Sequence, residues 1–196
     1  FVGTFLLALL LGMFCALREN SLADKVLCKL GTISSSIPTF IVALLLILIF
    51  SVTLGWLPSS GAYAIGHSTS FASRIQHLIL PLTAIVVTHV WYYAYMVRNR
   101  LLLELAQNYV LLAKAKGIKR FSIMIQHCLR NIAPMYISLM VVSIPHIIGG
   151  TYIVEMVFTY PGLGTLAFES AKYHDYNLLM VICLLTGIVV IMFNAI

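Results

Sequence analysis

Long runs without a single charged residue are the feature that most limits what this chain can fold into. Five stretches lack Asp, Glu, Lys and Arg, and each is long enough, or nearly so, to cross a bilayer as a helix of about 20 residues. Only 9% of the residues are charged, whereas an ordinary soluble domain has about 25%. Backbone groups in lipid must pair within their own segment, which favours helices. The sequence therefore predicts an all-α polytopic membrane protein, with spans at about residues 1–17, 33–57, 75–97, 131–154 and 176–196.

The distribution of Lys and Arg predicts the orientation of these spans. The loops at about residues 18–29 and 98–130 hold ten of the twelve Lys and Arg residues, and the two opposite loops hold only Arg74 and Lys172. Basic loops stay in the cytoplasm, so we expect the chain to begin outside and to end inside. It starts at Phe1, without a methionine and already within an apolar run, so we expect a fragment that one more span preceded.

The basic loop at residues 98–130 is longer than a connection between two spans requires. Apolar residues recur in it at helical steps of three and four, Gly117 then stops the pattern, and residues 121–130 form a second helical stretch. The residues at helical steps are Leu102, Leu105, Ala106, Tyr109, Leu112 and Ala113. We expect this apolar face to cover membrane surface, other helices of the protein or a partner subunit.

Two features of the fourth apolar run carry both a structural and a functional interpretation. Glu155 lies near its outer end, where a carboxylate either pairs structurally or serves a function. Pro145, Gly149 and Gly150 loosen the helix that contains them. They form either a packing kink or a bend that helps a pathway alternate between two states.

The outer loop after this run has the composition of a sharp turn. Pro161 cannot donate a backbone hydrogen bond, and Gly162 and Gly164 permit unusual dihedral angles. Residues 165–173 could then form a short helix. The loop is therefore expected to re-enter the membrane surface sharply.

Metal and redox chemistry find little support in the sequence. The four cysteines lie in separate segments without Cys-x-x-Cys spacing, which favours free apolar thiols: Cys15, Cys28, Cys128 and Cys183. The histidines outside the basic loop show no ligand spacing either: His67, His77, His89, His146 and His174. We therefore expect no metal site and no cofactor.

Enzyme motifs are missing from the printed sequence. It contains no phosphate-binding Gly-x-x-x-x-Gly-Lys-Ser/Thr loop, so this chain should not hydrolyse ATP itself. It also has no Gly-x-Ser-x-Gly or His-Glu-x-x-His motif. An intramembrane enzyme that uses scattered histidines stays open as an alternative. A proton-coupled secondary carrier is another, although carriers normally place an ionisable residue deep in a span.

Short motifs follow one another along nearly the whole chain. The basic loop reads Tyr109-Val-Leu-Leu-Ala-Lys-Ala-Lys-Gly117, followed by Gln126-His-Cys-Leu-Arg-Asn131. The others are Ile37-Pro38, Leu57-Pro58, Ile79-Leu-Pro81, Gly149-Gly150, Ile153-Val-Glu155, Phe158-Thr-Tyr-Pro-Gly-Leu-Gly164 and Asp175-Tyr176. Together they resemble the ABC importer permeases of the dipeptide, oligopeptide and nickel transport family. The resemblance implies the type I ABC importer transmembrane fold over residues 1–196.

In that family the basic loop forms a coupling helix, which docks in a cleft of a cytoplasmic ATPase subunit. Ala113 and Gly117 match the second alanine and the glycine of the family's Glu-Ala-Ala motif. Leu111 and Leu112 stand where its glutamate and first alanine would be. This departure suggests apolar docking by the two leucines, supplemented by charge pairs from the neighbouring lysines.

The end of the loop also departs from the family pattern. His127 and Leu129 take the first and third places of an Ile-x-Leu-Pro ending, and Arg130 replaces its proline. The resemblance assigns ATPase coupling to Tyr109, Leu111, Leu112, Ala113, Lys114, Ala115, Lys116, Gly117, His127, Leu129 and Arg130.

The resemblance also implies a function and a set of partners. The chain would be a permease subunit of an ATP-driven, binding-protein-dependent importer in the bacterial cytoplasmic membrane. It would be surrounded by lipid and would assemble with a second similar permease subunit, two cytoplasmic ATPases and an extracytoplasmic binding protein, but not with nucleic acid. Short peptides are the expected substrate, with nickel or a metal chelate as the alternative. One sequence does not assign the faces of the spans, so it predicts no substrate-binding residues.

Overall fold

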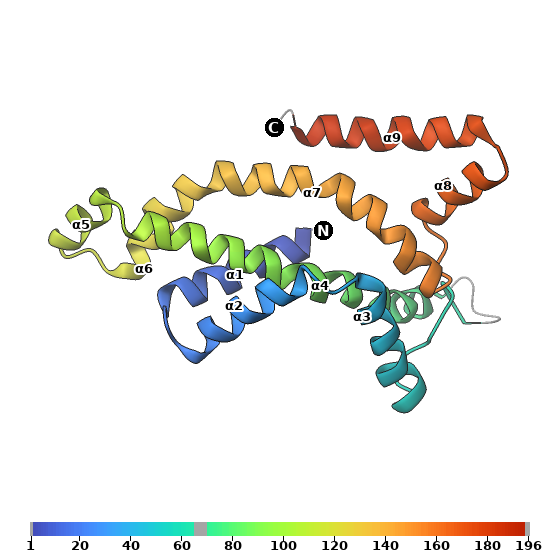
Figure 1. Ribbon diagram of the computed structural model, residues 1–196, viewed down its shortest axis with the longest axis horizontal. Helices are drawn as coiled ribbons and strands as arrows, with labels where there is room; N and C mark the ends of the chain where they lie inside the picture. The colour runs from blue at the N-terminus through green and yellow to red at the C-terminus, as the bar shows by residue number, and fades with distance from the viewer. Residues whose placement is uncertain (1, 65–69, 195–196) are drawn as a thin grey trace. The chain divides into compact units, whose positions relative to one another are not determined.

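The computed structural model describes residues 2–64 and 70–194, and for residues 144–150 and 193–194 it describes the backbone alone (Figure 1). Every regular element in these ranges is helical. The elements are α1 (Val2–Leu17), α2 (Leu22–Ser34), α3 (Thr39–Leu46), the π-helical η1 (Ile47–Thr53), α4 (Phe71–Leu105), α5 (Asn108–Ala115), α6 (Arg120–Ile123), the π-helical η2 (Met124–Cys128), α7 (Leu129–Val157), α8 (Leu163–Lys172) and α9 (Tyr176–Asn194). The all-α class is thus confirmed for the described part of the chain.

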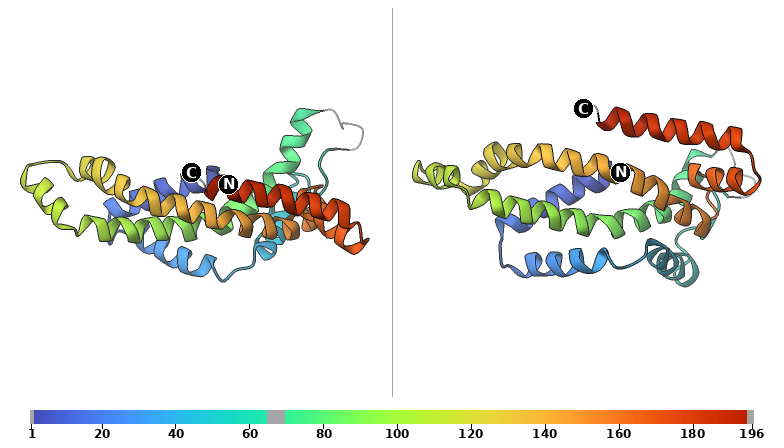
Figure 2. Two further views of the ribbon diagram at one scale, coloured as in Figure 1. Left: turned by 90° about the horizontal axis from the view of Figure 1, so that it is seen from above. Right: turned by 45° about the horizontal axis from the view of Figure 1, so that its top comes forward.

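The chain divides into two compact units. The first contains Phe1–Ser36 and Thr88–Met140, and the second contains Ile37–Val87 and Val141–Ile196. Helices α4 and α7 contribute residues to both units, and Figure 2 shows them from two further sides, α4 in green and α7 in yellow to orange.

In the first unit, α1 packs closely against α4 and α7. A β-carbon at Gly12 would lie 2.7 Å from the carbonyl oxygen of Ala94, so only glycine allows this approach of α1 to α4. The ring of Phe5 stacks on Tyr93 with 4.3 Å between the ring centroids. The buried hydroxyl of Tyr136 donates a hydrogen bond of 2.6 Å to the carbonyl oxygen of Phe5. Aromatic packing of this kind adds stability beyond the burial of apolar area.

The second unit has its own apolar cluster where α3, α4 and α7 meet. Its buried members are Ala43, Leu80, Ala84, Val154 and Phe158. The backbone N–H of Gly61 donates a hydrogen bond of 2.8 Å to the carbonyl oxygen of Phe158, which fastens the 54–64 connection to the end of α7.

By length and apolar composition, one described helix could cross a membrane on its own, the 35-residue α4. Helices Leu22–Ser34 and Thr39–Thr53 pass the same test only when they are taken together, across a break between them. Val2–Leu17 and Tyr176–Met192 are shorter apolar helices. Five membrane spans therefore stay a prediction.

The expected second span, residues 33–57, is not one helix in the structure. α2 ends at Ser34, and helix resumes only at Thr39, with Pro38 as the extended residue before it. The residue before a proline is biased away from the helical region, and proline has no N–H to donate. The stretch holds no charged residue, so a search for charge-free runs did not separate its two parts.

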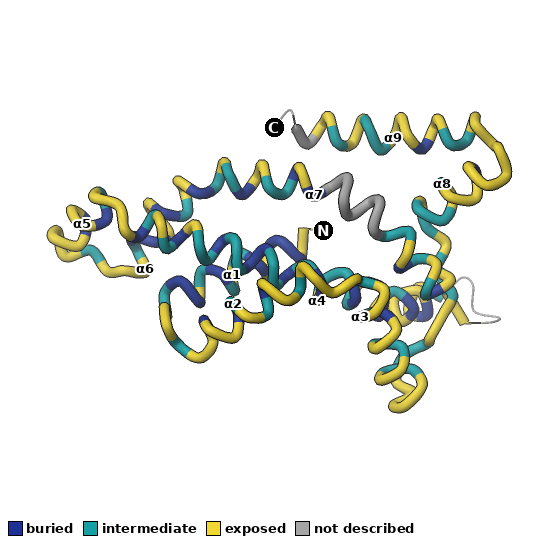
Figure 3. The backbone as a smooth tube through the Cα atoms, in the orientation of Figure 1, coloured by how far each residue is buried: buried dark blue, intermediate teal, exposed yellow. Residues whose placement is uncertain are grey.

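Large apolar side chains are exposed along several helices, and Figure 3 marks all exposed residues of the chain in yellow. In α9, for example, Leu184 and Ile191 are 65% and 68% exposed. A soluble monomer rarely exposes continuous apolar patches of more than a few hundred Å². These faces are therefore suited to contact with lipid or with other protein helices.

Candidate functional site

The basic loop contains a short, well-bounded helix, α5. α4 ends at Leu105, and Gln107 has the extended dihedrals φ −74° and ψ 153° that begin α5. At the other end Gly117 has φ +77°, a left-handed conformation that glycine adopts without steric penalty. The N–H groups of Gly117 and Ile118 donate to the carbonyl oxygens of Lys114 and Ala113, at 2.9 and 3.2 Å. This bond pair is a Schellman motif, and it confirms Gly117 as the stop of the helix.

The break at Gln107 makes one sequence prediction wrong. The apolar pattern predicted a single helix through residues 102–113, with Leu112 and Ala113 on the same apolar face. In the structure Ala113 is buried, whereas Leu112 is 60% exposed. The non-helical turn between α4 and α5 changes which side of α5 faces the protein, and a periodicity count does not detect such a turn.

α5 therefore has two unlike faces. Val110 and Ala113 are buried on the inner face. Leu111 and Leu112 are adjacent on the outer face, where their side chains are 58% and 60% exposed. The three residues that follow Ala113 are also exposed: Lys114, Ala115 and Lys116. The result is an apolar pair followed by two cations on a protruding helix.

Tyr109 fixes α5 to the neighbouring helices α4 and η2. Its hydroxyl donates a 2.8 Å hydrogen bond to Oε2 of Glu104, and Nδ2 of Asn131 donates to the same oxygen at 3.3 Å. The hydroxyl also lies 3.6 Å from Sγ of Cys128. Burial raises the pKa of Tyr109, and its hydrogen bonds to Cys128 and Glu104 raise it further. The phenol therefore stays protonated and acts as the donor.

Of the residues at the end of the predicted coupling motif, His127 lies close to Tyr109. The ring of His127 lies 6.4 Å from that of Tyr109, measured between centroids. Leu129 and Arg130 begin α7, with Leu129 partly buried and Arg130 exposed. The residues expected to stretch from 121 to 130 as one helical segment form α6, η2 and the start of α7.

A second group of predicted residues lies at the junction of α7 and α8. Oε2 of Glu155 accepts a 2.7 Å hydrogen bond from the backbone N–H of Thr165, which is in the first turn of α8. A methyl group at Gly162 would overlap this carboxylate, with a distance of 2.6 Å to Oε2. A β-carbon at Gly164 would lie 2.7 Å from Cα of Tyr152. Glu155 and the two glycines thus build the turn into α8.

The predicted short helix of this loop is confirmed, and it begins at Leu163, two residues earlier than expected. Pro161 is exposed just before it. Pro145, Gly149 and Gly150 lie within the helical backbone of α7, but their surroundings are outside the described side chains. Whether they gate a pathway or only pack stays a prediction. An open hollow of about 730 Å³ beside α8, lined among others by Glu155, was not foreseen from the sequence.

Another feature missed by the sequence interpretation is a buried ion pair between Asp24 and Arg98. Asp24 follows Ser21 by three residues, a spacing typical of a helix start. That signal indicates the start of α2, but nothing in the sequence pairs Asp24 with a cation 74 residues away. No three His, Cys, Asp or Glu residues of the described part are grouped so that they could hold a metal ion.

This chain has apolar helices with exposed aliphatic faces, joined by a basic helical loop. These features are typical of helical membrane proteins. Within this class, the chain belongs to the family of binding-protein-dependent transport system inner membrane components, whose model matches residues 8–196.

Named relatives agree with this family. The oligopeptide transport system permease protein AppB of Bacillus subtilis is 34% identical over 94% of this chain and 58% of its own length. The oligopeptide transport system permease protein OppB of Haemophilus influenzae is 31% identical over 100% of this chain and 61% of its own length. The metal-staphylopine import system permease protein CntB of Staphylococcus aureus is 29% identical, over 98% of this chain and 58% of its length. The chain therefore spans about three fifths of the length of these relatives.

Proposed function

We propose that this chain is the transmembrane part of a permease subunit in an ATP-driven, binding-protein-dependent importer of short peptides. The observation that supports the proposal is the structure of α5, with one buried face and one exposed apolar face. The helix is fixed on its inner side by Tyr109 and by buried Val110, and it presents Leu111 and Leu112 outward. An apolar pair of this kind, held on a short protruding helix, is suited to insertion into a cleft of a partner protein.

The partner is a cytoplasmic ATPase subunit. Ten of the twelve Lys and Arg residues lie in the two loops on the α5 side, so the positive-inside rule puts α5 in the cytoplasm. Without a phosphate-binding loop of its own, the chain takes its energy from the docked ATPase. Closure of two ATPases on ATP then displaces α5, and the spans shift between outward-open and inward-open states.

The remaining partners are proposed on the basis of family membership. A second permease subunit completes the pathway, and an extracytoplasmic binding protein delivers the substrate to the outer loops. Peptides are favoured as the substrate because the relatives AppB and OppB are named oligopeptide permeases. A metal chelate or nickel is the second candidate, which the relative CntB, named for metal-staphylopine import, supports.

The docking face is tested by measuring capture of the ATPase by leucine variants. Full burial of a leucine stabilises by about 1.5–3 kcal/mol. Leu111 and Leu112 are 58% and 60% exposed before docking, so substitution of either by Ala should weaken capture about three- to tenfold. The matched controls are Gln107→Ala and Asn108→Ala, because both residues are exposed on the same segment and are polar. Equal capture by leucine variants and controls would reject the docking face.

Transport is tested with the intact permease in liposomes. Alone, it should show neither ATP hydrolysis nor uptake. Addition of the second permease, the ATPases and the binding protein should restore both, and uptake of labelled peptide against that of nickel or a metal chelate decides the substrate. Uptake by the isolated subunit, driven by a proton gradient, would instead establish a secondary carrier.

A further inference from the structure

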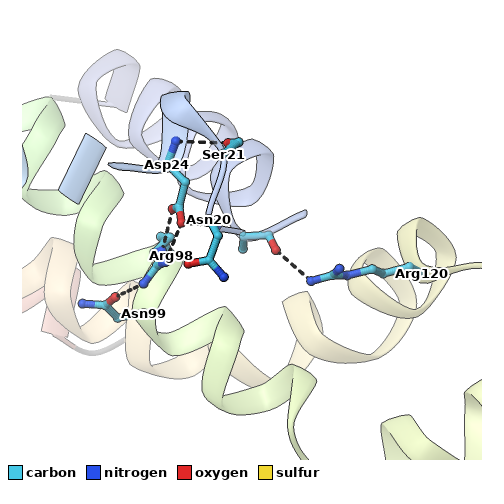
Figure 4. Close-up of polar contacts among 7 residues, drawn as sticks. Asn20, Ser21, Asp24, Arg98, Asn99 and Arg120 are labelled. Carbon is cyan, nitrogen blue, oxygen red and sulfur yellow. Dashed lines mark hydrogen bonds and ion pairs between the residues drawn. The ribbon is translucent and has the colours of Figure 1, made fainter. Parts of the chain in front are cut away.

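A buried ion pair holds the α1–α2 turn (residues 18–21) to α4. Nε of Arg98 donates to Oδ1 of Asp24 at 2.7 Å, and Nη2 of Arg98 donates to Oδ2 at 2.6 Å (Figure 4). The side chains of Asp24 and Arg98 are 2% and 16% exposed. Oδ2 also accepts the backbone N–H of Asn20 at 2.9 Å, so this carboxylate fixes the turn and α4 at once. Two parallel bonds from one guanidinium define orientation as well as distance.

Close packing makes the α1–α2 hairpin and this part of α4 one body. At Gly31, in α2, a β-carbon would lie 2.5 Å from Cβ of Tyr95 and 3.0 Å from the carbonyl oxygen of Trp91. Gly12, in α1, makes the equivalent approach to Ala94. Helices that approach so closely that only glycine fits between them move as one unit and do not deform gradually.

The coupling segment (residues 106–128) is joined to this body by a second polar contact. Nη2 of Arg120, the first residue of α6, donates a 3.1 Å hydrogen bond to the carbonyl oxygen of Ala16 in the last turn of α1 (Figure 4). The C-terminal end of a helix carries partial negative charge, so a cation is favourable there. Within the described residues, no other hydrogen bond joins the coupling segment to α1 or to the turn.

Apart from this bond, the coupling segment is not packed solidly against the turn. A hollow of about 310 Å³ lies between them, and it is lined by Glu19, Leu102, Leu105, Ala106, Lys114 and Arg120. α5 is also bounded by two non-helical joints, at Gln107 and at Gly117. Without the Arg120 bond, a displaced α5 could thus tilt about these joints and leave α1 in place.

We propose that Arg120 is a positioning residue that carries the displacement of α5 to the α1–α2 hairpin, and that the Asp24–Arg98 pair passes it on to α2 and α4. The inference rests on the proposed coupling role of α5. With Arg120 in place, α6 pulls on the end of α1 when α5 moves. Without it, α1 and α2 stay behind, so the ATPases continue to hydrolyse ATP while import falls.

The test compares Arg120→Gln with Lys119→Gln in the assembled importer in liposomes. Both substitutions remove one exposed positive charge from adjacent positions. The Lys119 side chain makes no hydrogen bond or ion pair with the described residues, which makes it the matched control. Arg120→Gln should lower the substrate imported per ATP hydrolysed at least threefold without weakening ATPase capture, whereas Lys119→Gln should leave the ratio unchanged. The conservative Arg120→Lys should restore part of the ratio.

Two results of this assay would overturn the inference. One is an unchanged ratio of import to hydrolysis in Arg120→Gln. The other is a loss of ATPase capture in that variant, which would make Arg120 a docking residue. The double exchange Asp24→Arg with Arg98→Asp should recover part of the ratio that Asp24→Arg alone loses, and failure to recover any would remove the ion pair from the relay.

Failure of the proposed function itself is seen separately, because the unmutated complex would then import nothing. In that case the contact is judged by amide hydrogen exchange in the permease alone. Arg120→Gln should speed exchange in the α1–α2 turn and in α6 relative to Lys119→Gln. Equal exchange in the two variants would show that Arg120 does not hold these elements together.

Discussion

Substitution of Gly162 by Ala should destabilise the second unit through a single clash with Glu155. Gly162 precedes α8 with φ −140°, a conformation that any residue adopts, so backbone strain is not involved. The added methyl group would overlap the Glu155 carboxylate, whose Oε2 accepts the N–H of Thr165. The carboxylate must then leave the first turn of α8.

The magnitude follows from what the carboxylate does at this helix end. Loss of a side-chain acceptor at a helix N-terminus destabilises by about 0.5–2 kcal/mol. Loss of a negative charge near that end adds about 0.3–1 kcal/mol. We therefore expect Gly162→Ala to lower the free energy of unfolding by about 2 kcal/mol, which corresponds to a thermal midpoint about 4–8 °C lower in a domain of this size.

A double-mutant cycle isolates this clash. The thermal midpoint of the detergent-solubilised permease is measured for Gly162→Ala, for Glu155→Ala and for the double variant. In the Glu155→Ala background, Gly162→Ala should cost less than about 0.5 kcal/mol, because the group that it displaces is gone. Gly187→Ala is the matched control, since a β-carbon there meets nothing within 4 Å. Additive losses in the two backgrounds would refute the reasoning.

Three further predictions concern the first unit and the orientation of the chain. Gly117→Pro should leave membrane insertion intact but stop uptake, because proline cannot adopt φ +77°, whereas Gly117→Asn should keep most uptake; uptake by well-inserted Gly117→Pro would contradict this. The hydrogen bond from Arg98 lowers the pKa of Asp24, so its stabilisation is present above about pH 4 and is lost as the pH falls through the lowered pKa. Asp24→Asn should therefore cost about 3 kcal/mol at pH 7 and weaken the loss of stability below pH 4 in thermal melts; an unchanged acid profile would count against the pair. A cysteine in place of Lys116 should be labelled only from the cytoplasm and one in place of Ser60 only from outside, and reversed labelling would overturn the orientation.

The two ends of α5 differ in how well the sequence predicts them. Gly117 was predictable as the stop because a glycine after a run of helix formers, with lysines in the last turn, is a local signal. The start at Gln107 was not, because Leu102, Leu105 and Ala113 keep helical spacing across the break. Tertiary contacts lie at this break: Tyr109 donates a hydrogen bond to Glu104, and Glu104 accepts a second one from Asn131 of α7. Such contacts override local periodicity.

Glu155 shows the same limit at the junction of α7 and α8. Its position near the end of an apolar run indicated either pairing or function, and Gly162 indicated a turn. Gly162 leaves room for the Glu155 carboxylate only because of the path that the irregular turn between them takes, and the sequence does not predict that path. The role of Pro161 in the turn could be predicted without knowledge of that path, because proline restricts its own backbone wherever it stands.

The coupling segment combines loose joints with firm contacts, and this combination supports a role in transmission. Free joints at Gln107 and Gly117 would let α5 rotate alone, and then docking at Leu112 would move nothing else. The hydroxyl of Tyr109 bridges the first joint to α4, and Arg120 reaches α1 beyond the second. Each joint is thus accompanied by one hydrogen bond to a helix of the first unit. A displacement of the coupling segment that keeps both bonds must carry α1 and α4 with it, whereas one that breaks either bond is confined to the segment.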